Sequence, residues 1–138
     1  FMYNLMIEQP IKVVDGGTQT RSFTYIDDGI DALMSIIKNE NNVATKQIFN
    51  LGNPNNTCSI LELAQAILLL YTKYQKNSTI LPSIEHINHE EYYGEGYQDI
   101  ASRKPNIDKA RTMLSWEPKI DLKTALNLTF EAFVLENV

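Results

Sequence analysis

Cysteine, basic charge and long hydrophobic runs are all scarce in this sequence. A single cysteine, Cys58, cannot form an intramolecular disulfide, so we expect a reducing compartment and a cytoplasmic location. Lys and Arg number 12 and Asp and Glu number 17, and the resulting net charge of −5 argues against nucleic acid as a partner. The longest apolar run, residues 66–71, is far shorter than the ~20 residues of a membrane span, so no membrane association is expected.

Motifs for cofactors and metals are also lacking. His86 and His89 lie close together beside Glu90, but their order is not H-E-x-x-H, so we interpret this segment as solvated and not as a zinc site. Cys58 stands near a predicted helix start, where a thiol can be activated, but without a histidine partner we interpret it as structural. No G-x-G-x-x-G or P-loop pattern is present, so no nucleotide cofactor site is expected at Gly16-Gly17, Gly52 or Gly94-Glu95-Gly96.

The size of the chain suits one domain. Its 138 residues, 43% of them hydrophobic, are enough to bury a sizeable core. Strand and helix patterns alternate along the sequence, which is typical of an α/β fold. The chain opens inside a patterned segment, residues 1–7, and not at an initiator Met. We therefore expect residues 1–138 to be a single domain or a fragment of a longer protein.

The first third of the chain predicts two strands and a helix. Ile11–Val14 and Thr18–Ile26 contain the β-branched and aromatic residues of strands, and they flank a turn at Asp15-Gly16-Gly17. Asp27 or Asp28 is expected to cap the helix that follows, and the helix dipole alone accounts for acidic residues at such a start. The apolar face of this helix, which we expect to pack on a core, consists of Ile30, Leu33, Met34 and Ile37.

The rest of the chain continues the alternation. Gln47–Leu51 predicts a strand, ended by the turn residues 52–56. Ser59 and Glu62 match a capping box, which makes the following helix the clearest in the sequence. Three further elements are predicted: a strand over Thr79–Ile87 bent at Pro82, a helix over Ile107–Leu114, and a helix from Asp121 with Leu122, Leu126, Phe130 and Phe133 inward.

Two polar stretches are candidates for ligand binding. Gln19, Arg21 and Phe23 fall on one side of a strand beside a glycine turn, which suits a polyanionic ligand. Arg103 follows a glycine-interrupted aromatic loop, residues 92–97, and a guanidinium there can hold phosphate or carboxylate through two hydrogen bonds. From spacing alone, each of these residues can equally be a surface ion-pairing residue.

Four motifs carry a resemblance to a known family: PIKVVDGGTQTRSF (residues 10–23), NLGNP (50–54), YYGEGYQD (92–99) and RKP (103–105). In them the chain resembles the C-terminal part of the extended short-chain dehydrogenases, also called the NAD-dependent epimerase/dehydratase family. It is most similar to the UDP-glucuronic acid oxidative decarboxylases linked to lipid A modification and polymyxin resistance. The resemblance implies an α/β fold that is the C-terminal substrate-binding portion of such an enzyme, with the N-terminal Rossmann half absent.

The resemblance also implies a reaction and a set of site residues. In these enzymes NAD oxidises the sugar C4 hydroxyl to a ketone, and the resulting β-keto acid loses carbon dioxide to give a UDP-4-keto-pentose. Arg103 matches the catalytic arginine of the decarboxylation step. Lys12, Gln19 and Arg21 match positions around the UDP portion, and Tyr97 matches a tyrosine on the loop that closes over the substrate.

Two departures from the family pattern limit what this chain is expected to do. It has neither the Tyr-x-x-x-Lys pair nor the glycine-rich NAD loop, both of which belong to the family's N-terminal Rossmann half. We therefore expect NAD to bind the N-terminal Rossmann half, and we expect that half to be a partner of this chain. The chain alone is expected to be inactive. It is also expected to self-associate through apolar surface that the Rossmann half would cover. Alternative interpretations are a related nucleotide-sugar epimerase or dehydratase, a UDP-xylose-forming decarboxylase, and a non-catalytic nucleotide-sugar-binding module.

Overall fold

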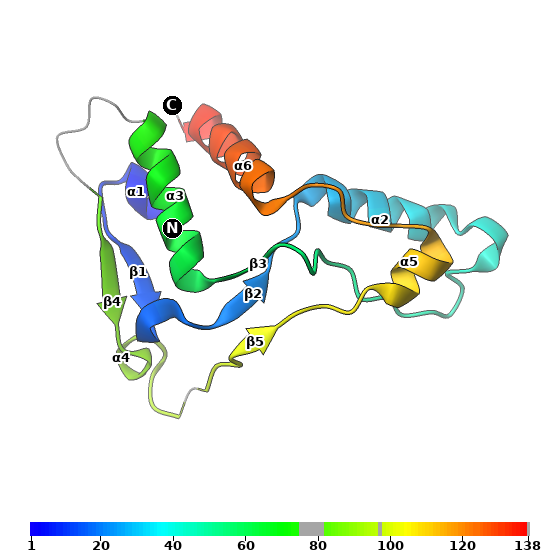
Figure 1. Ribbon diagram of the computed structural model, residues 1–138, viewed down its shortest axis with the longest axis horizontal. Coiled ribbons are helices and arrows are strands. Elements are labelled where there is room, and N and C mark those ends of the chain that lie inside the picture. Colours follow the sequence, from blue (N-terminus) through cyan, green and yellow to red (C-terminus); the bar gives the residue numbers. More distant parts are fainter. Residues whose placement is uncertain (75–81, 97, 138) are drawn as a thin grey trace. The chain divides into compact units, whose positions relative to one another are not determined.

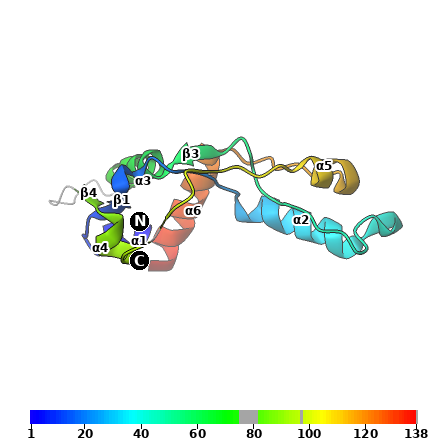
Figure 2. The ribbon, with the colours of Figure 1, turned by 90° about the horizontal axis from the view of Figure 1, so that it is seen from below.

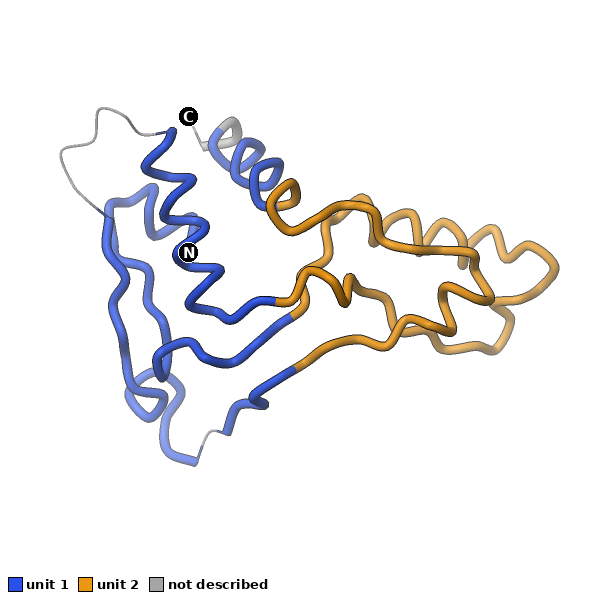
Figure 3. Tube along the Cα trace, in the orientation of Figure 1, with its two compact units in different colours: residues 1–21, 58–102, 126–138 blue, residues 22–57, 103–125 orange. Residues whose placement is uncertain are grey.

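The computed structural model describes residues 1–74, 82–96 and 98–137, and its helices and strands are labelled in Figure 1 and Figure 2. The chain divides into two compact units, coloured separately in Figure 3. Unit 1 contains Phe1–Arg21, Cys58–Ser102 and Leu126–Val138, and unit 2 contains Ser22–Thr57 and Arg103–Ala125. The chain enters each unit more than once, so neither unit is one continuous stretch of sequence.

Unit 1 is built on a pair of parallel strands. β1 (Ile11–Val14) pairs with β4 (Ile84–Ile87) in the register Ile11↔Ile84 to Val14↔Ile87. Ile11 and Val13 are fully buried, because alternate residues of a strand point to the same face. They join side chains from α1 (Met2–Met6), α3 (Ile60–Tyr74) and the later part of α6 (Leu122–Asn137). The buried cluster consists of Leu5, Ile11, Val13, Ala64, Ile67, Tyr71 and Phe130.

The two strands predicted around the glycine turn are confirmed, but they belong to different sheets. β2 (Thr20–Ser22) lies between β3 (Thr57–Ser59) and β5 (Ser102–Arg103) in a three-stranded sheet. A 3₁₀ turn, η1 (Asp15–Gly17), separates β1 from β2. β2 is shorter than the predicted strand, since residues 18–19 and 23–25 form no strand and the helix α2 (Ile26–Lys38) begins at the last predicted residue.

The predicted inward face of α2 is wrong. Leu33 is 53% exposed and Ile37 is 72% exposed, and Ile30 and Met34 are also exposed. The buried apolar residue of this helix is Ala32, which joins Ile107, Ala110 and Trp116 in the core of unit 2. α5 (Asp108–Leu114) packs on this side of α2. The contact between the two helices is therefore made by Ala32 and Ala110, and not by the large apolar residues of α2.

The strand predicted over Gln47–Leu51 is also wrong. Burial alternates there as in a strand, since Phe49 and Leu51 pack on the core of unit 2 while Ile48 is 85% exposed. No strand within the described ranges pairs with this segment. The sequence pattern correctly predicted the alternating burial of the side chains, but a strand also needs hydrogen bonds to a neighbouring backbone.

Several local predictions are confirmed. Ser59 Oγ accepts a hydrogen bond from the Glu62 amide at 3.1 Å, and the Glu62 carboxylate accepts from the Ser59 amide at 2.7 Å, as a capping box requires. These bonds hold the pKa of Glu62 below its ordinary value. α5 and α6 form where predicted. Of the strand predicted over residues 79–87, β4 forms over Ile84–Ile87, residues 82–83 form no strand, and 79–81 lie outside the described residues. Within the described ranges, no helix has the length and apolar character needed to span a bilayer.

Asp28 has a different role from the predicted helix cap. α2 begins at Ile26 after Tyr25, with no side-chain capping bond among the described residues. Asp28 is 3% exposed, and its two carboxylate oxygens accept hydrogen bonds from the amides of Lys119 at 2.9 Å and Ile120 at 3.1 Å. Its backbone carbonyl accepts from the indole N–H of Trp116 at 3.0 Å. Asp28 therefore fastens the segment after α5 to the start of α2.

Replacing Asp28 with Ala is expected to destabilise unit 2 by about 1.5–3 kcal/mol, because two amide donors lose a charged acceptor. Urea unfolding followed by the fluorescence of Trp116, the single tryptophan, measures this. The control is Asp27→Ala, an exposed carboxylate in the same helical turn, with an expected change below about 1 kcal/mol. Equal effects of the two substitutions would contradict the role assigned to Asp28.

Candidate functional site

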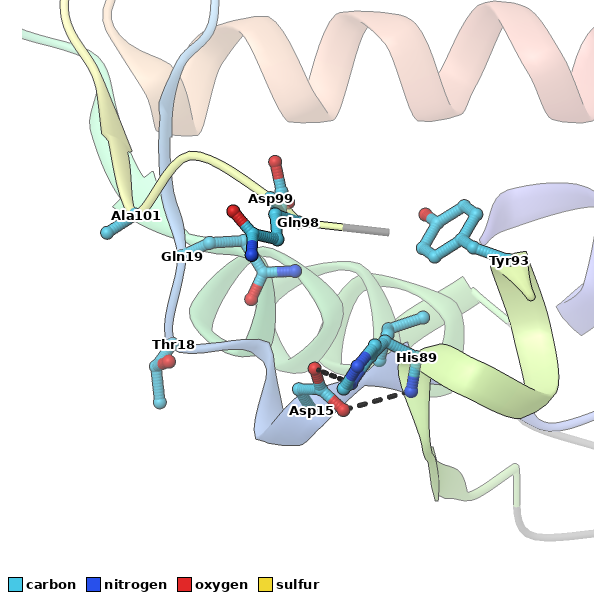
Figure 4. A pocket seen from close by; sticks show the side chains of 9 residues that line it. Asp15, Thr18, Gln19, His89, Tyr93, Gln98, Asp99 and Ala101 are labelled. Carbon is cyan, nitrogen blue, oxygen red and sulfur yellow. Dashed lines mark hydrogen bonds and ion pairs between the residues drawn. The ribbon is translucent and has the colours of Figure 1, made fainter. Parts of the chain in front are cut away.

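Unit 1 contains a pocket of about 460 Å³ (Figure 4). It lies where β1 and β4 end, since Val14 and Asp15 line it from one strand end and His89 lines it just after the other. Ligands of α/β proteins commonly bind beyond the carboxyl ends of parallel strands. The polar residues that line the pocket are Asp15, Thr18, Gln19, His89, Tyr93, Gln98 and Asp99.

The turn η1 positions one wall of the pocket. Asp15, Gly16 and Gly17 all have positive φ values, +48°, +72° and +67°. A Cβ atom on Gly17 would stand 2.4 Å from Val13 Cγ1 and 2.8 Å from the Leu61 amide nitrogen, so only glycine allows this approach of the turn to β1 and α3. The turn therefore determines where Thr18 and Gln19 enter the pocket.

Arg21 holds the opposite wall in place. Its Nη2 atom lies 2.6 Å from Asp99 Oδ1, and Nη1 donates to the carbonyl oxygens of Thr20 at 2.7 Å and Ile100 at 2.9 Å. The Thr20 amide also donates to the Ala101 carbonyl at 2.8 Å. The guanidinium is therefore paired with a carboxylate of the pocket wall.

The site residues named from the resemblance have different positions in the structure. Gln19 lines the pocket, and Arg21 reaches it through Asp99. Lys12 is exposed on β1 opposite Glu85 and does not line the pocket. Tyr97 lies outside the described residues.

Arg103 belongs to unit 2, where it is exposed in β5. Its backbone carbonyl accepts a hydrogen bond from Ser22 Oγ at 3.3 Å. Its guanidinium makes no hydrogen bond or ion pair with the residues that the structure describes.

Sequence reasoning missed the pairing of Asp15 with His89. His89 Nδ1 lies 2.7 Å from Asp15 Oδ2, a contact that the sequence did not predict, although the His89 side chain is still 35% exposed and His86 on β4 is exposed. Aspartate followed by two glycines is a sign of a constrained turn, but nothing in the sequence pointed from that turn to His89. In the described part of the chain, no group of three or more His, Cys, Asp and Glu residues is arranged to hold a metal ion.

Cys58 is half-buried as the middle residue of β3, two residues before α3 begins. Burial, followed by the negative charge of Glu62, raises the pKa of its thiol. A raised pKa lowers the thiolate fraction at neutral pH, which agrees with the structural interpretation of this residue.

Known proteins similar to this chain support one family. Residues 1–52 match the NAD dependent epimerase/dehydratase family. Over 138 residues the chain is 41% identical to the bifunctional polymyxin resistance protein ArnA of Wigglesworthia glossinidia brevipalpis, and the match covers 99% of this chain and 21% of that protein. The chain is related to the NAD-dependent epimerase/dehydratase family.

Solved structures of the epimerase/dehydratase type share the fold. PbgP3 of Burkholderia pseudomallei aligns with a TM-score of 0.79 and 36% identity over 96% of this chain and 36% of its own. The UDP-glucuronic acid 4-epimerase of Bacillus cereus, solved with UDP-glucuronic acid and NAD, aligns with a TM-score of 0.70 and 22% identity, which shows the fold alone. The chain thus spans about a fifth of the ArnA relative and about a third of PbgP3, and it is a mixed α/β part of this fold.

The family uses NAD, but the residues of this chain do not fit a dinucleotide. A dinucleotide site needs a glycine-rich loop that leads from a strand directly into a helix N-terminus. Gly16 and Gly17 lead from β1 to β2, which is a strand and not a helix. A Cβ atom at Gly52 would lie 2.7 Å from Pro105 Cγ, so this glycine allows close packing on a proline. Gly94 follows the end of the short helix α4 (His89–Tyr93) and does not precede a helix start. None of these three glycine positions meets the requirement.

The chain by itself is therefore expected to bind NAD no more tightly than millimolar. Calorimetric titration of the 138-residue chain with NAD measures this, with UDP titrated under the same conditions as the positive comparison. A micromolar affinity for NAD would contradict the assignment of the cofactor to residues outside this chain.

Proposed function

We propose that this chain is the substrate-binding part of an NAD-dependent UDP-glucuronate decarboxylase, which oxidises C4 of the sugar and releases carbon dioxide to form a UDP-4-keto-pentose. The pocket beyond β1 and β4 carries the proposal, because Gln19 lines it and Arg21 braces its wall. The 41% identity with the ArnA relative adds support.

Three residues of unit 1 are proposed to bind the nucleotide. The amide of Gln19 can both donate to and accept from an uncharged group of the ligand. The planar fork of Arg21 suits a diphosphate, which would take over the anionic role that Asp99 has in this structure. Lys12 is proposed to supply a point charge to the phosphates, and Tyr97 to contact the substrate.

Arg103 is proposed to act on the substrate carboxylate. When a β-keto acid decarboxylates, the electron pair of the breaking C–C bond moves toward the ketone, carbon dioxide leaves, and the resulting enolate takes a proton. A guanidinium beside this group orients the carboxylate and stabilises the negative charge that develops on the enolate oxygen. The Arg103 guanidinium is exposed and makes no pair with described residues, so its donors are available for this role.

The test uses the full-length protein that contains this chain, incubated with UDP-glucuronate and NAD. Carbon dioxide and NADH formed in equal amounts support the proposal. Carbon dioxide without net NADH points to the UDP-xylose-forming branch, which returns the hydride to the sugar. Conversion to the C4 epimer with neither product would overturn the proposal in favour of an epimerase.

A further inference from the structure

One carboxylate holds both the side chain and the backbone of His89. Asp15 Oδ2 lies 2.7 Å from His89 Nδ1, and Asp15 Oδ1 accepts a hydrogen bond from the His89 amide at 3.0 Å (Figure 4). A carboxylate beside Nδ1 keeps the proton on that nitrogen and fixes the ring orientation. The other ring nitrogen, Nε2, has no partner among the residues that the structure describes.

The Asp15–His89 pair is held at the ends of the two paired strands of unit 1. Asp15 directly follows Val14 of β1, and His89 comes two residues after Ile87 of β4, which is the register partner of Val14. The close approach of Gly17 to β1 and α3 restrains the turn that contains Asp15. Asn88 caps the helix α4, since its Oδ1 atom accepts from the Glu90 amide at 2.8 Å. The imidazole is thus preorganised, which reduces the conformational entropy lost when a ligand binds.

The charges in the pocket determine which ligand group suits Nε2. Of the two lining carboxylates, Asp99 forms an ion pair with Arg21, and Asp15 accepts from the Nδ1 N–H of His89. The remaining polar side chains of the lining, Thr18, Gln19, Tyr93 and Gln98, are hydroxyl and amide groups. With the ring proton on Nδ1, Nε2 is an acceptor, and a sugar hydroxyl can donate to it whereas an ionised phosphate oxygen cannot.

We propose that His89 is a ligand-binding residue, whose Nε2 atom accepts a hydrogen bond from a ring hydroxyl of the bound nucleotide sugar, and that Asp15 is its positioning residue. This inference rests on the proposed function, which it deepens by naming a sugar-contacting residue. The hydroxyl belongs to the ribose or to the hexose, and binding of UDP and of UDP-glucuronate distinguishes these two sources.

The decisive variant is His89→Asn in the 138-residue chain. The Asn amide nitrogen occupies the place of Nδ1 and keeps the bond to Asp15, while the group at the Nε2 position is removed. Loss of one hydrogen bond is expected to weaken UDP-glucuronate binding by about 3–10-fold. The matched control is His86→Asn, the other histidine of the chain, which is exposed on β4 and does not line the pocket.

Binding is measured by NMR titration with UDP-glucuronate and with UDP. An equal loss for both ligands in His89→Asn assigns the contact to the ribose, and a loss for UDP-glucuronate alone assigns it to the hexose. Unchanged affinity for both ligands overturns the inference while leaving the proposed function intact. Failure of the unmodified chain to bind either ligand overturns both.

Nitrogen-15 NMR of the two imidazoles tests the positioning role of Asp15. In the unmodified chain His89 is expected to carry its proton on Nδ1, and the Nε2 resonance is expected to shift when UDP-glucuronate binds. Asp15→Asn, which tolerates the φ of +48°, is expected to abolish the preference for that tautomer and to weaken binding. A His89 tautomer that does not respond to Asp15→Asn would contradict the positioning role.

Discussion

Replacing Arg103 with Ala in the full-length protein is expected to lower kcat for carbon dioxide release by about 100-fold or more, since donors to a developing negative charge contribute effects of this size. The loss is expected in kcat because the charge on the enolate exists only after the C–C bond begins to break. Carbon dioxide release and NADH formation with UDP-glucuronate are the two measurements. Arg103→Lys is expected to recover only part of the rate, because an ammonium does not reproduce the planar fork.

Two other cations serve as comparisons for Arg103. Lys104→Ala removes an exposed neighbouring charge and is expected to leave kcat unchanged. Arg21→Ala is expected mainly to raise KM, because a diphosphate contact is equally strong in the ground state and the transition state. If Arg103→Ala retains the original kcat and raises only KM, Arg103 is a substrate anchor and its catalytic assignment is wrong.

Replacing Gly17 with Ala is expected to destabilise unit 1 by about 2–5 kcal/mol. Positive φ contributes about 1–2 kcal/mol for a residue with a Cβ atom, and overpacking against Val13 and Leu61 adds about 1–3 kcal/mol. Urea unfolding followed by hydrogen exchange of the β1 and α3 amides measures the effect on this unit. We also expect weaker UDP binding, because the turn positions Gln19 in the pocket.

Gly16→Ala separates the two contributions. Gly16 has nearly the same φ, +72° against +67°, but no described atom lies within 4 Å of the position of its Cβ. This variant is therefore expected to lose only the backbone contribution of about 1–2 kcal/mol. Equal destabilisation by the two substitutions would show that the close approach of Gly17 to Val13 and Leu61 does not contribute to the effect on stability.

Local sequence was sufficient for the elements whose determinants lie within a few residues of one another. The capping box of Ser59 and Glu62 joins residues three positions apart, and it correctly predicted the start of α3. β1 and α5 were also predicted, because short-range patterns of apolar and turn residues describe them. Gln19, which its place after a glycine turn marked as a candidate, lines the pocket, and its role in ligand binding stays a prediction.

The tertiary structure alone decided which faces and which distant groups meet. The apolar period of α2 predicted a helix, but the packing of α5 buried Ala32 in place of Leu33 and Ile37. Gln47–Leu51 had the residues of a strand, yet strand formation depends on a neighbouring backbone, and the described residues provide none.

The polar contacts of the site also depend on the tertiary structure, because they join residues that are far apart in the sequence. Asp15 and His89 are 74 residues apart in sequence, and Arg21 and Asp99 are 78 apart. The sequence determined that carboxylates, an imidazole and a guanidinium were available. Which carboxylate pairs with which cation depends on the parallel register of β1 with β4 and on the order of β2 and β5, because spacing along the chain carries no information about contacts between residues so far apart.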